Sequence, residues 1–138
     1  MSEKVSKFPE KALIIDSPHI ERILSGEKTW EMRSRNCQIR GLIGLIRKGS
    51  GQVVGVVEIV GVSGPLTRDE LMANLDKHRR TTEQLDDPKL AKWNIAWLLD
   101  KACPLPRPVS YVHPKGAQSW INLDDKVRRA IAKQMENF

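Results

Sequence analysis

Cysteines and long apolar runs are scarce in this chain. The two cysteines, Cys37 and Cys103, are isolated, and neither has a second Cys or His at metal-ligand spacing, which excludes a disulfide framework and a zinc cage. No apolar run approaches the roughly 20 residues of a membrane-spanning helix. Residues 1–4 lack the layout of a signal peptide. We therefore expect a cytoplasmic protein with reduced thiols, no membrane association, no metal and no cofactor.

Acidic residues are missing from two long stretches. None occurs between Met32 and Val57 or between Lys101 and Leu123, although the 138 residues include 17 Asp and Glu beside 23 Lys and Arg. The first stretch holds five basic residues, namely Arg33, Arg35, Arg40, Arg47 and Lys48. The net charge of +6 says little by itself, because many proteins of this size are merely basic. Its concentration in stretches without acids favours an anionic partner, with nucleic acid first.

The length is enough for one hydrophobic core. Residues 1–11 are polar and without periodicity, so we expect a flexible N-terminal arm before a single domain over residues 12–138. Ala12–Ile15 is a short apolar run typical of a buried strand. A helix should follow over about Pro18–Ser25, with Ser17 as its cap and the proline at its first position.

Three further stretches have the composition of strands. Thr29–Arg33 alternates polar and apolar residues, which is a strand pattern. Leu42–Arg47 and Val53–Val62 are β-branched and apolar, and the glycine-rich link between them predicts a hairpin. Trp120–Leu123 should form a final strand.

Helix signals recur in the second half. Thr67 and Glu70 have capping-box spacing, which predicts a helix to about residue 75. The charged stretch that follows indicates surface turns and one short helix, at either Thr82–Leu85 or Pro88–Trp93. Asp124 should cap a last helix whose apolar stripe holds Val127, Ile131 and Met135.

One stretch is ambiguous. Asn94–Lys101 fits a helix face through the spacing of Trp93 and Trp97, and it fits a buried strand equally well. The prolines at 104, 106 and 108 exclude a central strand and favour an extended edge segment. Together these elements predict an α+β fold, a small mixed or antiparallel β-barrel with peripheral helices.

The densest group of chemically useful residues is the stretch from Gly26 to Arg33. On a strand, Glu31 and Arg33 point to the same face, and Lys28 sits at the turn before it. One interpretation is a polar pocket in which the cations hold an anionic group and Glu31 orients them. The other is an ion pair that braces the turn. Spacing alone does not decide between them.

Other cations and turns extend the candidate site. Ser17 and His19 lie at a helix start, where free N–H groups favour anions, although such a histidine is often simply exposed. Arg35 follows the predicted strand in a loop. Lys48 stands at the glycine-rich hairpin tip, which either approaches a phosphate or is only a tight turn.

Base stacking requires aromatic side chains beside basic ones. The chain has four Trp, one Tyr and two Phe. We select Trp30 and Trp120 as stacking candidates because each adjoins a basic, turn-rich stretch, whereas Trp93 and Trp97 suit the core. Glu58 lies in an apolar strand and needs a partner, for which a cation from the Gly26–Arg33 stretch is the natural candidate.

Gly26-Glu27-Lys28-Thr29-Trp30-Glu31-Met32-Arg33 matches the G-x-K-x-x-E-x-R signature of the ASCH (activating-signal-cointegrator homology) domain family. The Pro-His-Ile helix start at residues 18–20, the hairpin and Gly116-Ala117-Gln118-Ser119-Trp120 also resemble that family. The resemblance covers about residues 12–123 and implies a PUA-like β-barrel. It also implies a cleft beside the first helix that is thought to bind RNA or a modified nucleoside.

Some family members are acetylcytidine amidohydrolases, and others are reported as ribonucleases. In the amidohydrolases a Thr nucleophile follows the Lys by three residues, and a later segment supplies a Glu. Here Glu31 stands third after Lys28, and Thr29 is one residue after it. Glu83 is a candidate for the later carboxylate by position.

Two functions from different classes follow. The first is RNA binding, in which Lys28 and Arg33 contact phosphate or a base edge, Glu31 orients them, and Trp30 or Trp120 stacks on a base. The second is a small hydrolase of RNA or an acylated nucleoside, in which Lys28 is the base and Glu31 its partner. A protein-interaction domain with a filled cleft is a third possibility.

Overall fold

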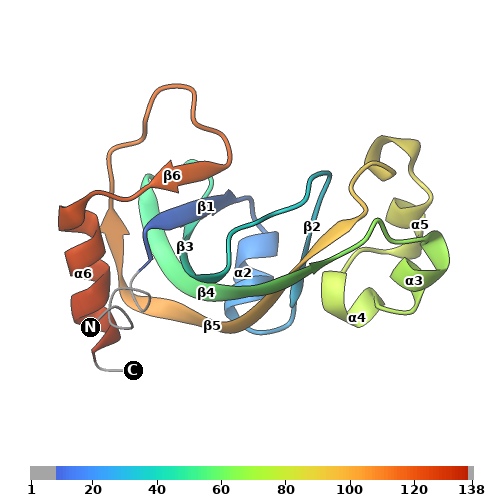
Figure 1. The fold of residues 1–138 in the computed structure, drawn as a ribbon, viewed down its shortest axis with the longest axis horizontal. Coiled ribbons are helices and arrows are strands. Elements are labelled where there is room, and N and C mark those ends of the chain that lie inside the picture. The colour runs from blue at the N-terminus through green and yellow to red at the C-terminus, as the bar shows by residue number, and fades with distance from the viewer. Residues whose placement is uncertain (1–8, 137–138) are drawn as a thin grey trace.

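The computed structural model describes residues 9–136, and its centre is one six-stranded sheet curled into a half-barrel (Figure 1). Along the sheet the strands are ordered β2-β5-β4-β3-β1-β6. β1 pairs with β3 in parallel, and the other neighbours are antiparallel. The strands are β1 Lys11–Ile15, β2 Trp30–Arg33, β3 Gly41–Arg47, β4 Gln52–Ser63, β5 Ile95–Ser110 and β6 Trp120–Asn122. This mixed sheet with peripheral helices confirms the predicted α+β fold.

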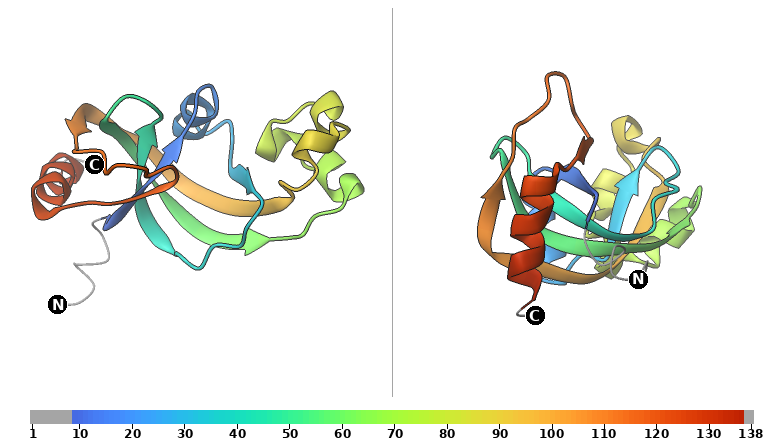
Figure 2. Two further views of the ribbon diagram at one scale, coloured as in Figure 1. Left: turned by 90° about the horizontal axis from the view of Figure 1, so that it is seen from above. Right: turned by 60° about the vertical axis from the view of Figure 1, so that its left-hand side comes forward.

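The helices occupy three places around the sheet. Figure 2 shows α2 (His19–Leu24) lying over the curled sheet, where it packs on β4 and β5. α6 (Asp125–Met135) covers β5 at one end of the molecule. The other end holds α3 (Arg68–Met72), α4 (Leu75–His78), α5 (Thr82–Leu85) and the 3-10 turn η1 (Pro88–Leu90).

Close approach of α2 to the sheet depends on a glycine. Gly55 of β4 lies under the side chain of Leu24, and a Cβ atom there would collide with Leu24 and approach the carbonyl oxygen of Cys103 to 2.9 Å. Ile20 and Ile23 of α2 are both fully buried beneath this contact. A glycine in the strand therefore sets how deeply the helix sits.

Most predicted elements are confirmed, including the hairpin of β3 and β4 and the cap of α6 by Asp124. Thr67 and Glu70 form the predicted capping box, although α3 ends at Met72 and a separate α4 follows. Both alternatives for the short helix exist, as α5 and as η1. The predicted arm over residues 1–11 falls mostly outside the described residues, and the domain boundaries stay a prediction.

The start of α2 differs from the prediction. Pro18, not Ser17, is its N-cap residue, and no side chain caps the helix. The Ser17 hydroxyl donates instead to the carboxylate of Glu21, at 2.9 Å. The peptide bond before Pro18 is cis.

The ambiguous stretch is a strand. Residues 95–98 pair with β2 on one side, and the same strand runs on through the three prolines to Ser110. Beyond Asp100, β5 pairs only with β4 among the described strands, so the prolines lie on a sheet edge, as predicted. The start of β5 is a strand and not a helix because β2 and β4 supply hydrogen-bond partners for its backbone on both sides.

Candidate functional site

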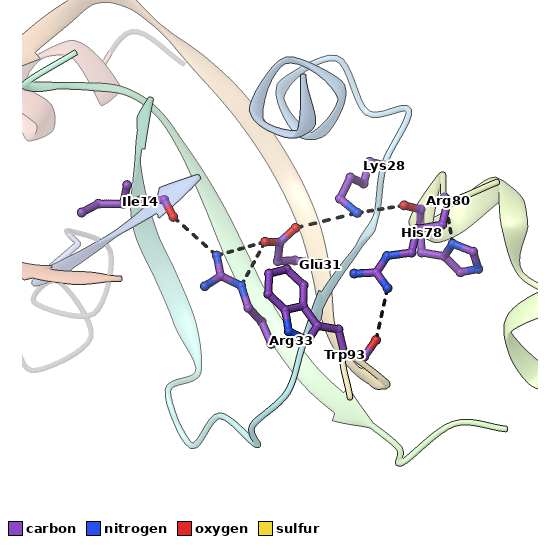
Figure 3. Close-up of polar contacts among 7 residues, drawn as sticks. All are labelled: Ile14, Lys28, Glu31, Arg33, His78, Arg80 and Trp93. Atoms are coloured by element: carbon purple, nitrogen blue, oxygen red, sulfur yellow. Dashed lines mark hydrogen bonds and ion pairs between the residues drawn. The ribbon is translucent and has the colours of Figure 1, made fainter. Parts of the chain in front are cut away.

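Glu31 is the centre of a charged cluster, by which we mean Lys28, Glu31, Arg33 and Arg80. Its carboxylate is mostly buried, and Figure 3 shows the cations around it. Arg33, two residues further along β2, places Nε and Nη2 each 3.0 Å from Oε2 of Glu31. Nζ of Lys28 lies 3.7 Å from Oε1. The same-face geometry expected of a strand brings Glu31 and Arg33 together, and Lys28 reaches Glu31 from the turn before β2.

Lys28 is almost completely buried, with 3% of its surface exposed. Its ammonium donates a hydrogen bond of 2.8 Å to the carbonyl oxygen of His78. Burial lowers the pKa of Lys28 to about 8, and the positive charges of Arg80 and Arg22 act in the same direction, against the carboxylate of Glu31. A substantial fraction of this amine is therefore neutral just above physiological pH.

Arg33 connects β2 with the opposite part of the half-barrel. Its Nη2 donates to the carbonyl oxygen of Ile14 on β1 at 3.4 Å, and its guanidinium lies 5.3 Å from the centre of the Trp97 ring. Trp97 in turn stacks on Trp120 of β6, with ring centroids 6.0 Å apart. Arg33 therefore links β2 to β1 in addition to pairing with Glu31.

The segment after α4 supplies the fourth charge of the cluster. The His78 ring is fully buried, with Nδ1 3.0 Å from the backbone nitrogen of Arg80 and Nε2 2.8 Å from the carbonyl oxygen of Leu71. This network assigns the ring proton to Nε2 and leaves Nδ1 as an acceptor. Burial, above all, lowers the pKa of His78, which keeps the ring neutral.

Arg80 leaves this segment toward Glu31 (Figure 3). Its Nη1 makes a long contact of 3.5 Å with the carbonyl oxygen of Trp93, and its guanidinium lies 5.7 Å from the centre of the indole ring. The Trp93 side chain borders the cluster in Figure 3 and is 40% exposed. A half-buried cation beside an exposed aromatic ring is an arrangement suited to a bound ligand.

The other predicted site residues are dispersed. Trp30 packs with Leu66 and Leu71 and lies under Lys77, so its ring is on the side of β2 away from Glu31. Ser17 is bonded to Glu21. Arg35 and Lys48 are exposed. Roles for these four residues in binding stay predictions.

Two carboxylates that were candidate partners lie elsewhere. Glu58 sits on β4 between Leu42 and Asp100 and makes no ion pair with the Gly26–Arg33 stretch among the described residues. Both cations of that stretch pair with Glu31 instead. Glu83 is exposed on α5.

Sequence reasoning missed Arg80, His78 and the exposed position of Trp93. His78 and Arg80 belong to the charged stretch that follows α3, and Trp93 lies at the end of that stretch. The composition of the stretch resembles that of an ordinary solvated surface. The only signal was the pair Arg79-Arg80 next to a histidine. It identifies no site without knowledge that this segment packs against Lys28.

The described surface includes two hollows of note. One of about 240 Å³ lies beside the C-terminal end of α2, where Gly26 and Lys28 face Lys101. The other, of about 310 Å³, lies between Tyr111 and α6. Within residues 9–136, no group of three His, Cys, Asp or Glu side chains is placed to hold a metal, and no helix is long and apolar enough to cross a membrane.

The curled half-barrel with a helix over its sheet has the architecture of a PUA-like domain. The ASCH domain family model matches residues 13–109, and the chain belongs to this family. No curated protein matches the chain.

Solved structures of an ASCH protein from Zymomonas mobilis have the same fold. The unsubstituted protein superposes with a TM-score of 0.66 at 18% identity, covering 96% of each chain. Two point mutants of it give TM-scores of 0.66 and 0.67 at 17% and 16% identity, covering 89% and 92% of this chain and 96% of theirs. At this identity the likeness concerns the fold.

Proposed function

We propose that this protein binds single-stranded RNA at the charged cluster and the aromatic side chains that border it. The observation that carries the proposal is the arrangement around Glu31, where one mostly buried carboxylate is surrounded by Lys28, Arg33 and Arg80. The cluster therefore has a positive surplus. An RNA strand supplies both kinds of group that such a cluster accepts, namely anionic phosphates and base-edge donors.

Oε1 of Glu31 is the oxygen that we propose accepts from a base. Oε2 accepts a hydrogen bond from Nε of Arg33 and forms an ion pair with its Nη2, whereas the contact of Oε1 with Lys28 is a long ion pair of 3.7 Å. An exocyclic amino group of a base is a donor that a carboxylate oxygen accepts well. Glu31 would thus read a base edge while Arg33 holds the carboxylate in place.

Trp93 and Trp120 are the proposed stacking surfaces. Trp93 is partly exposed beside Arg80, and Trp120 is partly exposed and already stacked on Trp97. Each stacked base is worth roughly 1–3 kcal/mol. Arg35 and Lys48 are proposed as further phosphate contacts outside the cluster.

The test is the affinity for a labelled single-stranded RNA of about ten nucleotides, measured by anisotropy between 50 and 200 mM salt. Each phosphate contact should contribute a slope of about −0.7 in log affinity against log salt concentration. Arg80→Gln should weaken binding and reduce that slope. Arg129→Gln, which removes the same charge from the exposed surface of α6, is the matched control. Affinity that does not change with salt would refute the proposal.

A second candidate function is hydrolysis of RNA or an acylated nucleoside, and the lowered pKa of Lys28 favours it. A lysine with a pKa of about 8 can take up a proton near neutral pH, with Glu31 as its charge partner. Incubation with acylated cytidines and RNA oligonucleotides tests this function. Turnover should be abolished in Lys28→Met, and turnover equal to that of the unsubstituted protein would exclude this role for Lys28.

A further inference from the structure

The cluster has more positive charge than its carboxylate can balance. Lys28 and Arg33 share Glu31, whereas Arg22 and Arg80 form no ion pair in the part of the chain that the structure describes. Half-buried cations without a counter-ion are costly, because they have lost water without gaining a partner. Burial accordingly lowers the pKa of Arg80.

Two cationic groups beside Glu31 have few partners. In Figure 3 the guanidinium of Arg80 and the ammonium of Lys28 lie on the same side of Glu31. Among the described residues Lys28 has one hydrogen bond, to His78, and a long ion pair, which leaves at least one of its three N–H groups free. Within residues 9–136, the contact of 3.5 Å with Trp93 is the only hydrogen bond that the Arg80 side chain makes.

His19 provides an independent sign of a missing partner. Its Nδ1 atom is buried, yet it has no hydrogen-bond partner within residues 9–136. Most buried polar atoms do have a partner, so an orphaned one calls for an explanation such as a ligand. The pKa of His19 is lowered, first by burial and then by Lys28, while Arg22 and Arg80 also lower it and Glu31 opposes them. These charges come from α2, the turn before β2, β2 itself and the segment after α4.

We propose that one phosphodiester group of the bound strand occupies the space between Arg80, Lys28 and His19, with Arg22 at its border. The ligand's identity as RNA rests on the proposed function. The anion site itself rests on the surplus of cations and on the orphaned imidazole nitrogen.

The chemistry of the donors selects a phosphate over other ligands. Arg80, Lys28 and a protonated His19 offer only N–H donors, and a phosphodiester offers only acceptors and a negative charge. A guanidinium fork can bind two phosphate oxygens at once. A metal cation would be repelled, and a neutral base edge would leave the positive surplus unbalanced.

Inorganic phosphate is the probe for the site, because it needs no base recognition. The pKa of His19 is measured by NMR in sodium phosphate and in sodium chloride at equal ionic strength. Bound phosphate adds a negative charge beside Lys28, Arg22 and Arg80, so it should raise the His19 pKa. By linkage, phosphate should bind more tightly as the pH falls through that pKa. A His19 pKa that is the same in both salts would overturn the proposal.

Charge-removing variants locate the site. Arg80→Gln should weaken phosphate binding by roughly tenfold, as expected for loss of a charge-assisted contact, and Arg129→Gln should not change it. Arg22→Gln offers a second test with a smaller loss, should Arg80→Gln fail to fold. Equal phosphate affinities in Arg22→Gln, Arg129→Gln and the unsubstituted protein would show that phosphate does not bind at this site.

The RNA and phosphate results separate the two proposals. Phosphate binding without RNA binding would refute the RNA proposal and keep the anion site. RNA binding that Arg80→Gln leaves unchanged would refute the anion site and would leave Lys28 and Arg33 as the RNA contacts of the cluster. A trinucleotide without a terminal phosphate should bind more tightly than a nucleoside 5′-monophosphate, and the reverse order would exclude an internal diester.

Discussion

Trp120 of β6 stacks on Trp97 of β5, with ring planes 18° apart, although the two strands are four positions apart in the sheet. The half-barrel is therefore closed by side chains where its strands do not meet. Arg33 adds a second link across the same gap through its bond to the carbonyl oxygen of Ile14. Closure of the fold and assembly of the charged cluster depend on the same residues.

Removal of the indole in Trp120→Ala should destabilise the fold by about 2 kcal/mol, because the half-buried ring loses both its apolar contact and its stacking. Urea unfolding followed by circular dichroism measures this loss. Trp93→Ala is the matched control, since its ring is largely solvated on one side. A loss in Trp120→Ala no larger than in Trp93→Ala would contradict the role in closure.

Stability should depend on pH through Lys28. Its pKa is lowered from 10.5 to about 8 in the folded protein, so between these values the unfolded chain holds a proton that the folded protein has released. The free energy of unfolding should therefore rise with pH across this window and be unaffected below it. One pKa unit corresponds to 1.36 kcal/mol, so the total rise in the free energy of unfolding across this window is about 3 kcal/mol. Unfolding of the unsubstituted protein and Lys28→Met at pH 7, 8, 9 and 10 isolates this contribution, and parallel curves would contradict it.

Gly55→Ala should destabilise the protein by roughly 2 kcal/mol, because the new methyl group meets Leu24 and the Cys103 carbonyl oxygen and the helix must shift. Gly61→Ala is a control in the same strand, since its nearest contact is the end of the Leu98 side chain at 3.4 Å. Thermal unfolding compares the two. Similar melting temperatures would mean that α2 is not held at a fixed depth.

His78 should act as a positioning residue for Arg80. His78→Asn keeps an acceptor close to the place of Nδ1, whereas His78→Gln keeps a donor close to the place of Nε2. Both variants should lose stability, since the ring is fully buried. RNA affinity, measured where both are folded, should be retained better in His78→Asn. A better retention in His78→Gln would show that the bond to the Arg80 backbone does not matter for binding.

Local signals in the sequence were sufficient for most of the fold. The capping box at Thr67 and Glu70 and the cap at Asp124 depend on neighbouring residues alone, so their spacing revealed them. The prediction that Ser17 caps α2 was wrong because the Ser17 hydroxyl donates to the carboxylate of Glu21 instead. The stretch from Asn94 could not be resolved, since its choice of strand depends on pairing with β2 and β4.

The site was predictable in part for the same reason. Strand periodicity puts Glu31 and Arg33 on one face, and Lys28 is close enough in the chain to reach Glu31 from the turn before β2. Arg80 and Trp93 join them only because the His78 carbonyl oxygen lies beside Lys28, across 50 residues of chain. Whether a tryptophan is in the core also depends on the fold, which explains why Trp30 lies apart from the cluster and Trp93 borders it.

The long strand β5 is shared by separate parts of the hydrophobic core. Its side chains enter three apolar clusters of the described core: Leu99 belongs to the cluster that holds Ile23, Leu105 to the cluster that holds Ile131, and Ala96 to the cluster that holds Leu66. No group can be lost without loosening a strand that the other two share. The consequence is a chain that opens as one cooperative unit, in which amide protons near the middle of β5 exchange most slowly with solvent. Unfolding of the end that carries α3–α5 should therefore be coupled to unfolding of the end that carries α6.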